Sequence, residues 1–105
     1  MIQEVSVAEL KKMRDDKEDF QLIDVRESHE ADICAIDGEL IPMGDVMDNL
    51  DKISKTKKVI VHCKSGRRSA AIIQALQTQG YNNLFNLKGG ILAWADEIDN
   101  TMAKY

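Results

Sequence analysis

The sequence predicts an α/β fold with a mainly parallel central sheet and helices on both of its faces. Short apolar runs rich in β-branched residues alternate with longer segments that carry apolar residues at helical spacing. This alternation is typical of parallel strands joined by crossover helices, which cover the sheet on both sides. A chain of 105 residues is long enough for one core, so we expect residues 1–105 to form a single domain.

The first half of the chain predicts a helix, a strand and a further helical segment. Ser6 and Glu9 have the spacing of a capping box, which predicts a first helix over about residues 7–16. Residues 21–25 are mostly apolar and predict a buried strand. Pro42 indicates a turn or a helix start, and apolar residues then recur at helical spacing as far as Ile53.

The second half continues the alternation. Residues 58–62 are rich in β-branched side chains and predict a second strand. The Ala-rich run that follows Ser69 predicts a mostly buried helix. Gly80 is expected to end it, because glycine readily adopts the left-handed conformation found there. The remaining elements are a third strand, a turn and a final amphipathic helix, at residues 84–87, 89–90 and 91–98.

Composition and charge exclude several classes of function. A net charge of −4 argues against a dedicated nucleic-acid-binding protein. No apolar stretch approaches the roughly 20 residues of a membrane span, and the amino terminus lacks a signal-peptide pattern. We therefore expect a cytoplasmic protein with no membrane association. In such a reducing compartment Cys34 and Cys63 are expected to be free thiols.

Cys63 opens the most informative segment, at the end of the strand predicted over residues 58–62. The segment continues through a Gly-containing turn with three cations into a helix, and reads Cys63-Lys64-Ser65-Gly66-Arg67-Arg68-Ser69. Cations and a helix N-terminus can lower a cysteine pKa from ~8.5 to roughly 3.5–7.5. The N–H groups of a turn that enters a helix can converge on an anion. The segment therefore predicts a thiolate nucleophile beside an anion-binding loop.

A second pair of polar residues, Asp24 and Arg26, lies at the end of the strand predicted over residues 21–25. In open α/β sheets, ligands bind at the carboxyl edge of the strands. Because Cys63 also lies at a strand end, we expect Asp24 and Arg26 to lie near it in space. An ion pair between the two, with a structural role, is the simplest interpretation.

Taken together, these segments resemble the single-domain rhodaneses, a family of sulfurtransferases. The likeness extends in order over nearly the whole chain: Leu22–Glu27 with Glu30, Ile41-Pro42, the loop from Cys63 to Ser69, and Gly80–Trp94. Residues 31–40 depart from a pattern that many members share. In this stretch the chain is similar to rhodanese domains attached to enzymes that activate sulfur-carrier proteins.

The resemblance implies a role for each site residue. Cys63 would be the catalytic residue and carry a persulfide, while the loop amides surround its sulfur and the basic side chains bind an anionic donor such as thiosulfate. The implied acceptor is thiophilic, the implied partner is a sulfur-relay protein or persulfide donor, and neither a metal nor an organic cofactor is expected. The implied substrate-binding residues are Lys64, Ser65, Gly66, Arg67, Arg68 and Ser69, and the supporting residues are Asp24 and Arg26.

Three other interpretations remain open from the sequence. Cysteine-dependent phosphatases and arsenate reductases also place His-Cys before an anion-binding loop, but Arg68 comes one residue too early for their signature. A non-catalytic binding module is the second, although inactive rhodanese-like domains typically lack the cysteine that this chain keeps. A zinc site from Cys34, Cys63, His29 and His62 is the third, and its spacing matches no standard zinc finger.

Overall fold

Five parallel strands form the central sheet of the computed structural model, which describes residues 2–105. The strands are β1 (Gln3–Val5), β2 (Phe20–Asp24), β3 (Glu39–Leu40), β4 (Lys58–His62) and β5 (Leu84–Leu87). Their order across the sheet is β1-β5-β4-β2-β3, and every neighbouring pair is parallel. The predicted α/β class with a mainly parallel sheet is confirmed.

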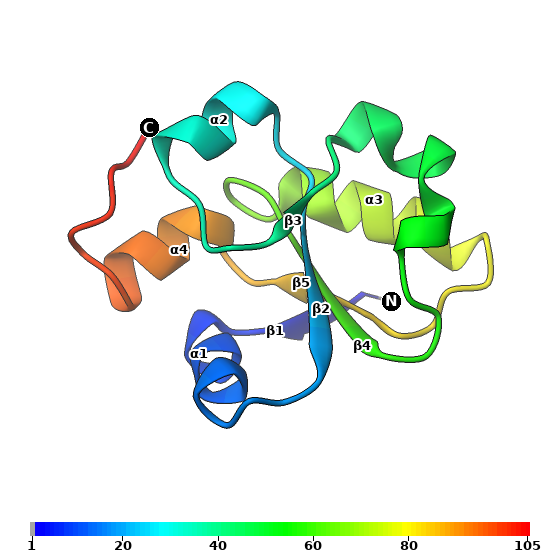
Figure 1. Cartoon of the computed structure of the whole chain (residues 1–105), viewed down its shortest axis with the longest axis horizontal. Coiled ribbons are helices and arrows are strands. Elements are labelled where there is room, and N and C mark those ends of the chain that lie inside the picture. Colours follow the sequence, from blue (N-terminus) through cyan, green and yellow to red (C-terminus); the bar gives the residue numbers. More distant parts are fainter. Residues whose placement is uncertain (1) are drawn as a thin grey trace.

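Helices cover both faces of this sheet. They are α1 (Val7–Asp15), α2 (Ser28–Ile33), α3 (Arg67–Gln77) and α4 (Gly90–Glu97), together with the 3₁₀ helices η1 (Met43–Asp48) and η2 (Leu50–Lys52). Figure 1 shows α1 and α4 on one side of the sheet, and α3 with the 3₁₀ helices on the other. Across residues 2–105, every helix is too short or too polar to cross a membrane.

Each face of the sheet has its own apolar core, because successive side chains of a strand point to opposite faces. In β4, Val59 and Val61 pack toward α3, whereas Ile60 packs toward α1 and α4. Adjacent residues of β2 divide in the same way: Ile23 belongs to the first core and Leu22 to the second. Burial on both sides explains why these strands read as continuous apolar runs in the sequence.

The predicted helix ends are confirmed in detail. The Ser6 hydroxyl accepts a hydrogen bond from the Glu9 amide at 3.0 Å, and the Glu9 carboxylate accepts one from the Ser6 amide at 2.9 Å. Gly80 has a φ of +91° beyond the end of α3, where its amide donates to the Gln77 carbonyl at 3.1 Å. The next amide donates to Leu76, which completes a Schellman-type end.

The segment from Pro42 to Ile53 differs from its predicted form. It builds two 3₁₀ helices instead of one regular helix, so a pattern spaced for 3.6 residues per turn does not line up on one face. Val46 is buried, whereas Met43 and Met47 stay 37% and 44% exposed. The sequence interpretation also missed β1, α2 and β3, which have two to six residues each and few buried apolar side chains.

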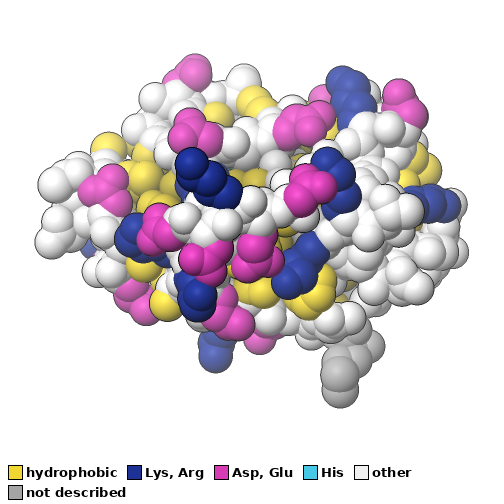
Figure 2. Space-filling model, turned by 60° about the horizontal axis from the view of Figure 1, so that its bottom comes forward, with side chains coloured by type: hydrophobic (Ala, Val, Ile, Leu, Met, Phe, Trp, Pro, Cys, Tyr) yellow, Lys and Arg dark blue, Asp and Glu magenta, His cyan; other side chains and the backbone are white. Residues whose placement is uncertain are grey.

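The edge of the sheet opposite Cys63 carries charges of both signs. Figure 2 shows acidic and basic side chains interspersed over this face. Exposed ion pairs of the protein include Lys11–Asp15 and Lys12–Asp16 along α1 and Lys57–Asp19, whose members precede β4 and β2. A shallow pocket of about 400 Å³ also opens at this end, far along the strands from Cys63, and is lined by Phe20, Gln21, Asp51, Lys52, Ser54 and Lys57. The exposed ion pairs named above contribute little to the free energy of unfolding.

Candidate active site

Cys63 lies directly after β4, at the carboxyl edge of the sheet, and begins the loop that leads into α3. Gly66 caps α3 with a φ of +105°, a left-handed conformation that folds the loop back toward Cys63. The Cys63 side chain belongs to the core on the α3 side and is only 1% exposed. The thiol is therefore covered by its own loop in this conformation.

Loop amides converge on the Cys63 sulfur. The Gly66 amide donates a hydrogen bond to Sγ at 3.1 Å, and the amides of Ser65 and Ser69 also face the sulfur. Burial raises the pKa of the Cys63 thiol, but the Ser69 hydroxyl and the amides of Ser69, Gly66 and Ser65 together outweigh burial and leave the pKa below its ordinary value. The loop thus favours the thiolate, the nucleophilic form of cysteine.

Ser69 and Asn86 hold the loop from inside. The Ser69 hydroxyl lies 3.4 Å from the Cys63 sulfur and donates a hydrogen bond to Asn86 Oδ1 at 2.6 Å. The Asn86 amide group in turn donates to the Gly66 carbonyl at 3.0 Å. The sequence analysis did not identify Asn86 as a site residue. The feature that could have indicated it is a polar residue in β5, a strand whose other side chains are apolar.

Gly89 and Gly90 bring α4 against the same loop. The amides of Ile91 and Leu92 donate to the carbonyls of Cys63 and Lys64, at 3.0 and 3.1 Å. Gly90 has a φ of +62°, and a Cβ on it would lie 2.8 Å from the Cys63 carbonyl oxygen and closer still to Lys64. The sequence predicted a turn here, and the structure shows that the turn lets two backbones touch.

Asp24 and Arg26 form a buried ion pair near the loop, 2% and 0% exposed respectively. Arg26 Nη2 lies 2.7 Å from Asp24 Oδ2, and Arg26 Nε donates to Asp24 Oδ1 at 2.9 Å. Arg26 also donates to the Cys34 carbonyl at 2.8 Å, which ties the end of α2 to β2. This geometry agrees with the structural interpretation of the pair.

His62 is buried between the ion pair and the loop. Its Nε2 lies 3.8 Å from Asp24 Oδ2 and has no hydrogen-bond partner among residues 2–105, while Nδ1 lies 3.4 Å from the Cys63 carbonyl. Burial lowers the pKa of His62 to about 4, so the ring is neutral at physiological pH. Neither ring nitrogen is placed on the Cys63 sulfur, consistent with a packed histidine.

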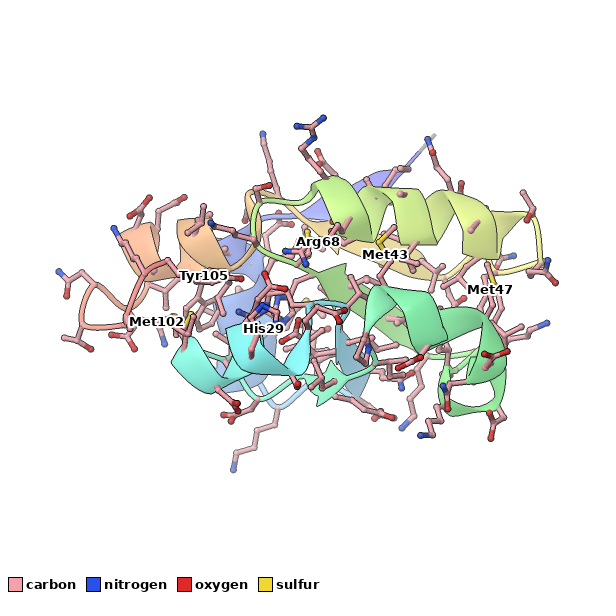
Figure 3. The ribbon with its side chains drawn as sticks, turned by 90° about the horizontal axis from the view of Figure 1, so that it is seen from above. His29, Met43, Met47, Arg68, Met102 and Tyr105 are labelled. Atoms are coloured by element: carbon pink, nitrogen blue, oxygen red, sulfur yellow. The ribbon has the colours of Figure 1, made fainter. Side chains whose placement is uncertain are left out.

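Arg68 turns toward α2. Its two terminal nitrogens each donate to a carboxylate oxygen of Glu30 at 2.8 Å. These bonds lower the pKa of Glu30 to about 2. Figure 3, which looks onto this edge, shows Arg68 between α3 and α2. The carboxylate therefore offsets much of the Arg68 charge that the sequence assigned to substrate binding.

The other two predicted cations differ from Arg68. Lys64 places its ammonium 4.5 Å from the centre of the Tyr105 ring. The Tyr105 hydroxyl accepts from Arg26 at 3.1 Å and donates to Glu30 at 3.0 Å, a link between the two arginine pairs that the sequence did not predict. Arg67 is exposed at the first position of α3. Within residues 2–105, no three His, Cys, Asp or Glu side chains are grouped closely enough to hold a metal ion.

This arrangement, a thiol cradled by main-chain amides after a central parallel strand, agrees with comparisons to known proteins. A family model described as "Rhodanese-like domain" matches residues 6–97. The chain belongs to the rhodanese-like family. A solved structure of a rhodanese-like domain protein from Staphylococcus aureus superposes with a TM-score of 0.84 at 32% identity, covering 92% of this chain and 95% of that one.

Two relatives show the settings in which similar rhodanese-like domains occur. A protein of Allochromatium vinosum named "Sulfurtransferase" is 35% identical over 96 residues, covering 90% of this chain and 90% of that protein. "Probable adenylyltransferase/sulfurtransferase MoeZ" of Mycobacterium tuberculosis is 35% identical over 104 residues. The match covers 96% of this chain but only 26% of the mycobacterial protein, so this chain spans about a quarter of that relative.

Proposed function

We propose that this rhodanese-like protein is a sulfurtransferase that carries sulfane sulfur on Cys63. The donor is thiosulfate or a persulfide, and the acceptor is a thiophilic group. The observation that carries the proposal is the convergence of the Gly66, Ser65 and Ser69 amides on the Cys63 sulfur, beside the Ser69 hydroxyl. Together these groups lower the pKa of the thiol. Family membership and the similarity to proteins named as sulfurtransferases support sulfur transfer as the general activity.

In the first half-reaction, the Cys63 thiolate attacks the outer sulfur of thiosulfate. A new sulfur–sulfur bond forms to Cys63 as the bond between the two thiosulfate sulfurs breaks. The bonding electron pair leaves with sulfite, so no outside oxidant or reductant is needed. Cys63 is left as a persulfide with a negative terminal sulfur, the covalent intermediate of a ping-pong reaction.

In the second half-reaction, cyanide or an acceptor thiolate attacks the terminal sulfur of this persulfide. The bond from that sulfur to Cys63 breaks, its electron pair returns to the cysteine as thiolate, and thiocyanate or a new persulfide leaves. The residues of the loop supply what both steps need: main-chain donors aimed at a sulfur that bears negative charge. One such donor in a comparable enzyme site is worth roughly 3–4 kcal/mol of barrier.

The basic side chains of the loop suit an anionic donor, but to different degrees. Arg67 is exposed and its fork of N–H donors matches a sulfonate, whereas Arg68 already binds Glu30 through two bonds. Because Cys63 is 1% exposed, the donor reaches the sulfur only after groups at the loop move aside. The engagement of Arg68 with Glu30 also disfavours a phosphatase, which needs a free arginine for the phosphate.

The name of one relative supports a sulfur-relay partner. The mycobacterial relative is named for two activities, adenylyl transfer and sulfur transfer. By analogy, we propose that a persulfide donor or a sulfur-relay protein exchanges sulfur with Cys63, with thiosulfate as the small-molecule equivalent of that donor. Neither a metal nor an organic cofactor enters either half-reaction.

Intact-protein mass spectrometry tests the proposal directly. Incubation with thiosulfate is expected to add the mass of one sulfur atom to the protein, and cyanide is expected to remove it as thiocyanate. A Cys63→Ser variant should take up none, while Cys34→Ser should behave as the parent. Phosphatase turnover without sulfur uptake would contradict the proposal, and so would the absence of both activities in a folded protein, which indicates a binding module.

A further inference from the structure

The Ser69 hydroxyl has two neighbours but only one hydrogen to donate. Its oxygen lies 3.4 Å from the Cys63 sulfur and 2.6 Å from Asn86 Oδ1. All three side chains are buried, with exposures of 0%, 1% and 5% for Ser69, Cys63 and Asn86. The orientation of a single hydrogen therefore decides how Ser69 acts on the nucleophile.

Asn86 fixes that orientation through its second contact. Its other amide atom lies 3.0 Å from the Gly66 carbonyl oxygen, which can only accept a hydrogen bond. The NH₂ group must therefore face Gly66, and Oδ1, which can only accept, must face Ser69. It follows that the Ser69 hydroxyl donates to Asn86.

The oxygen of Ser69 then presents a lone pair to Cys63. A Cys63 thiol can donate its hydrogen to this oxygen. The hydrogen bonds then form one continuous chain, in which Cys63 donates to Ser69, Ser69 to Asn86, and Asn86 to the Gly66 carbonyl. A Cys63 thiolate has no hydrogen to give. The thiolate can accept the Ser69 hydrogen only if the hydrogen bond from Ser69 to Asn86 breaks. Stabilisation of the thiolate by the hydroxyl therefore requires the loss of that bond.

We propose that Asn86 is a positioning residue which competes with the Cys63 thiolate for the single Ser69 hydrogen and so limits how strongly the loop favours the thiolate. This inference rests on the proposed function, in which Cys63 is the nucleophile. Thiolate nucleophilicity falls as the thiol becomes more acidic, and the best attacking thiol titrates near ambient pH. Asn86 thus limits how far the loop amides acidify Cys63 and keeps its thiolate reactive.

The charged groups near Cys63 are the same in every variant needed to test the role of Asn86. Arg68 interacts electrostatically with Cys63 across the start of α3. Other titratable or charged groups near the site are Lys64 in the loop, Arg67 at the start of α3, His62 in β4, Asp24 at the end of β2 with Arg26 after it, Glu30 in α2, and Tyr105. Because Asn86 and Ser69 are uncharged, replacing them with uncharged residues leaves this set unchanged.

The test is a double-mutant cycle read by thiolate titration. Cys34→Ala serves as the parent so that one thiol titrates, and Asn86→Leu is made with Ser69 intact and in a Ser69→Ala background. Ultraviolet absorbance of the thiolate is followed against pH. With Ser69 intact, Asn86→Leu is expected to raise the thiolate-to-thiol ratio about tenfold, as when a charged group gains a hydrogen bond. With Ser69→Ala, the same change should have little effect.

An unchanged or lowered ratio in Asn86→Leu with Ser69 intact would overturn the proposal. An equal rise in both backgrounds would also overturn it, since Asn86 would then act through Gly66 or through its size. If Asn86→Leu fails to fold, Asn86→Ala replaces it, with the same expected rise when Ser69 is intact and the same small effect with Ser69→Ala. The titration needs no sulfur donor, so it is independent of whether Cys63 transfers sulfur.

Discussion

The two sides of the active-site loop are built by different means. The inner loop, comprising Cys63, Gly66 and Ser69 with Asn86 of β5, is largely buried. It is held by hydrogen bonds between side chains and the Gly66 backbone and by the bond from Ser69 to Asn86. The loop rim consists of long charged side chains, Lys64, Arg67 and Arg68. Two of these contact other protein groups. Under the proposed function, this contrast predicts that the inner loop sets the reactivity of the sulfur and that the rim selects the donor.

The largest effect is expected where the inner loop is broken from behind. In Gly90→Ala, the new Cβ would clash with the carbonyl oxygens of Cys63 and Lys64, and the residue would keep a φ of +62°. We expect a loss of about 2–5 kcal/mol of unfolding free energy, from overpacking and backbone strain together. Sulfur uptake should fall with it. Urea unfolding and mass spectrometry measure the two effects.

Gly80→Ala is the matched control for this prediction. Gly80 also has a positive φ, +91°, but a Cβ there meets nothing within 4 Å. Its cost should be limited to about 1 kcal/mol from the backbone conformation, with normal sulfur uptake. Equal losses in the two variants would show that the contact between Gly90 and the loop does not matter.

Acid should lower the stability of the protein in two pH ranges, one set by His62 behind the inner loop and one by Glu30, which binds Arg68 of the loop rim. Burial holds the pKa of His62 at about 4 in the folded protein, whereas an unfolded histidine titrates near 6.5. Between these values the unfolded chain binds the extra proton, so stability falls as pH drops from about 6.5 to about 4, by at most about 3 kcal/mol. Glu30 has a folded pKa of about 2, so its contribution is lost from about 4.3 down to about 2.

Variants at these two positions assign each part of the curve. His62→Phe should flatten the dependence of unfolding free energy on pH in the upper window and leave the lower one in place. Glu30→Gln should do the reverse. Chemical denaturation at a series of pH values supplies the data, and an unchanged upper window in His62→Phe would show that His62 does not titrate as its burial requires.

The rim should control the choice of donor with a moderate effect. Arg67→Ala is expected to lower kcat/KM for thiosulfate about tenfold, the value of one charged hydrogen-bond contact, and to leave a neutral persulfide donor unaffected. Arg68→Ala should also reduce stability by about 1–2 kcal/mol, because Glu30 loses its bidentate partner. Equal losses with both donors would argue against an anion-binding role for either arginine.

Lys11→Ala controls for charge alone in that comparison. Lys11 pairs with Asp15 on the exposed surface of α1, an element that contributes no residue to the loop. Removing it changes the net charge by the same amount as removing Arg67. A similar loss of thiosulfate turnover in Lys11→Ala would indicate a general electrostatic effect instead of a local contact.

The smallest effect is expected at Tyr105. Tyr105→Phe removes the hydroxyl that bridges Arg26 and Glu30 but keeps the ring beneath the Lys64 ammonium. We expect a loss of about 1 kcal/mol in unfolding free energy and normal sulfur uptake, measured by thermal unfolding and mass spectrometry. A greater loss of thiosulfate turnover than in Arg67→Ala would indicate that this hydroxyl touches the donor.

The main elements and the position of Cys63 could be predicted because their signals are local. Strands buried on both faces give apolar runs, the Ser6–Glu9 spacing caps α1, and Gly80 ends α3 where a left-handed residue is needed. The three missed elements, β1, α2 and β3, are too short to carry a periodic pattern. They exist because neighbouring elements supply their hydrogen bonds and contacts.

By itself, the sequence determined that a cysteine would follow a buried parallel strand and enter a loop before a helix, because strand, turn and helix-start preferences act over a few neighbouring residues. Only the tertiary structure decided which groups surround that cysteine. Asn86, Gly90 and Tyr105 reach the loop from three other parts of the chain, and Glu30 takes the guanidinium of Arg68. Such pairings depend on packing between distant segments, which no local pattern encodes.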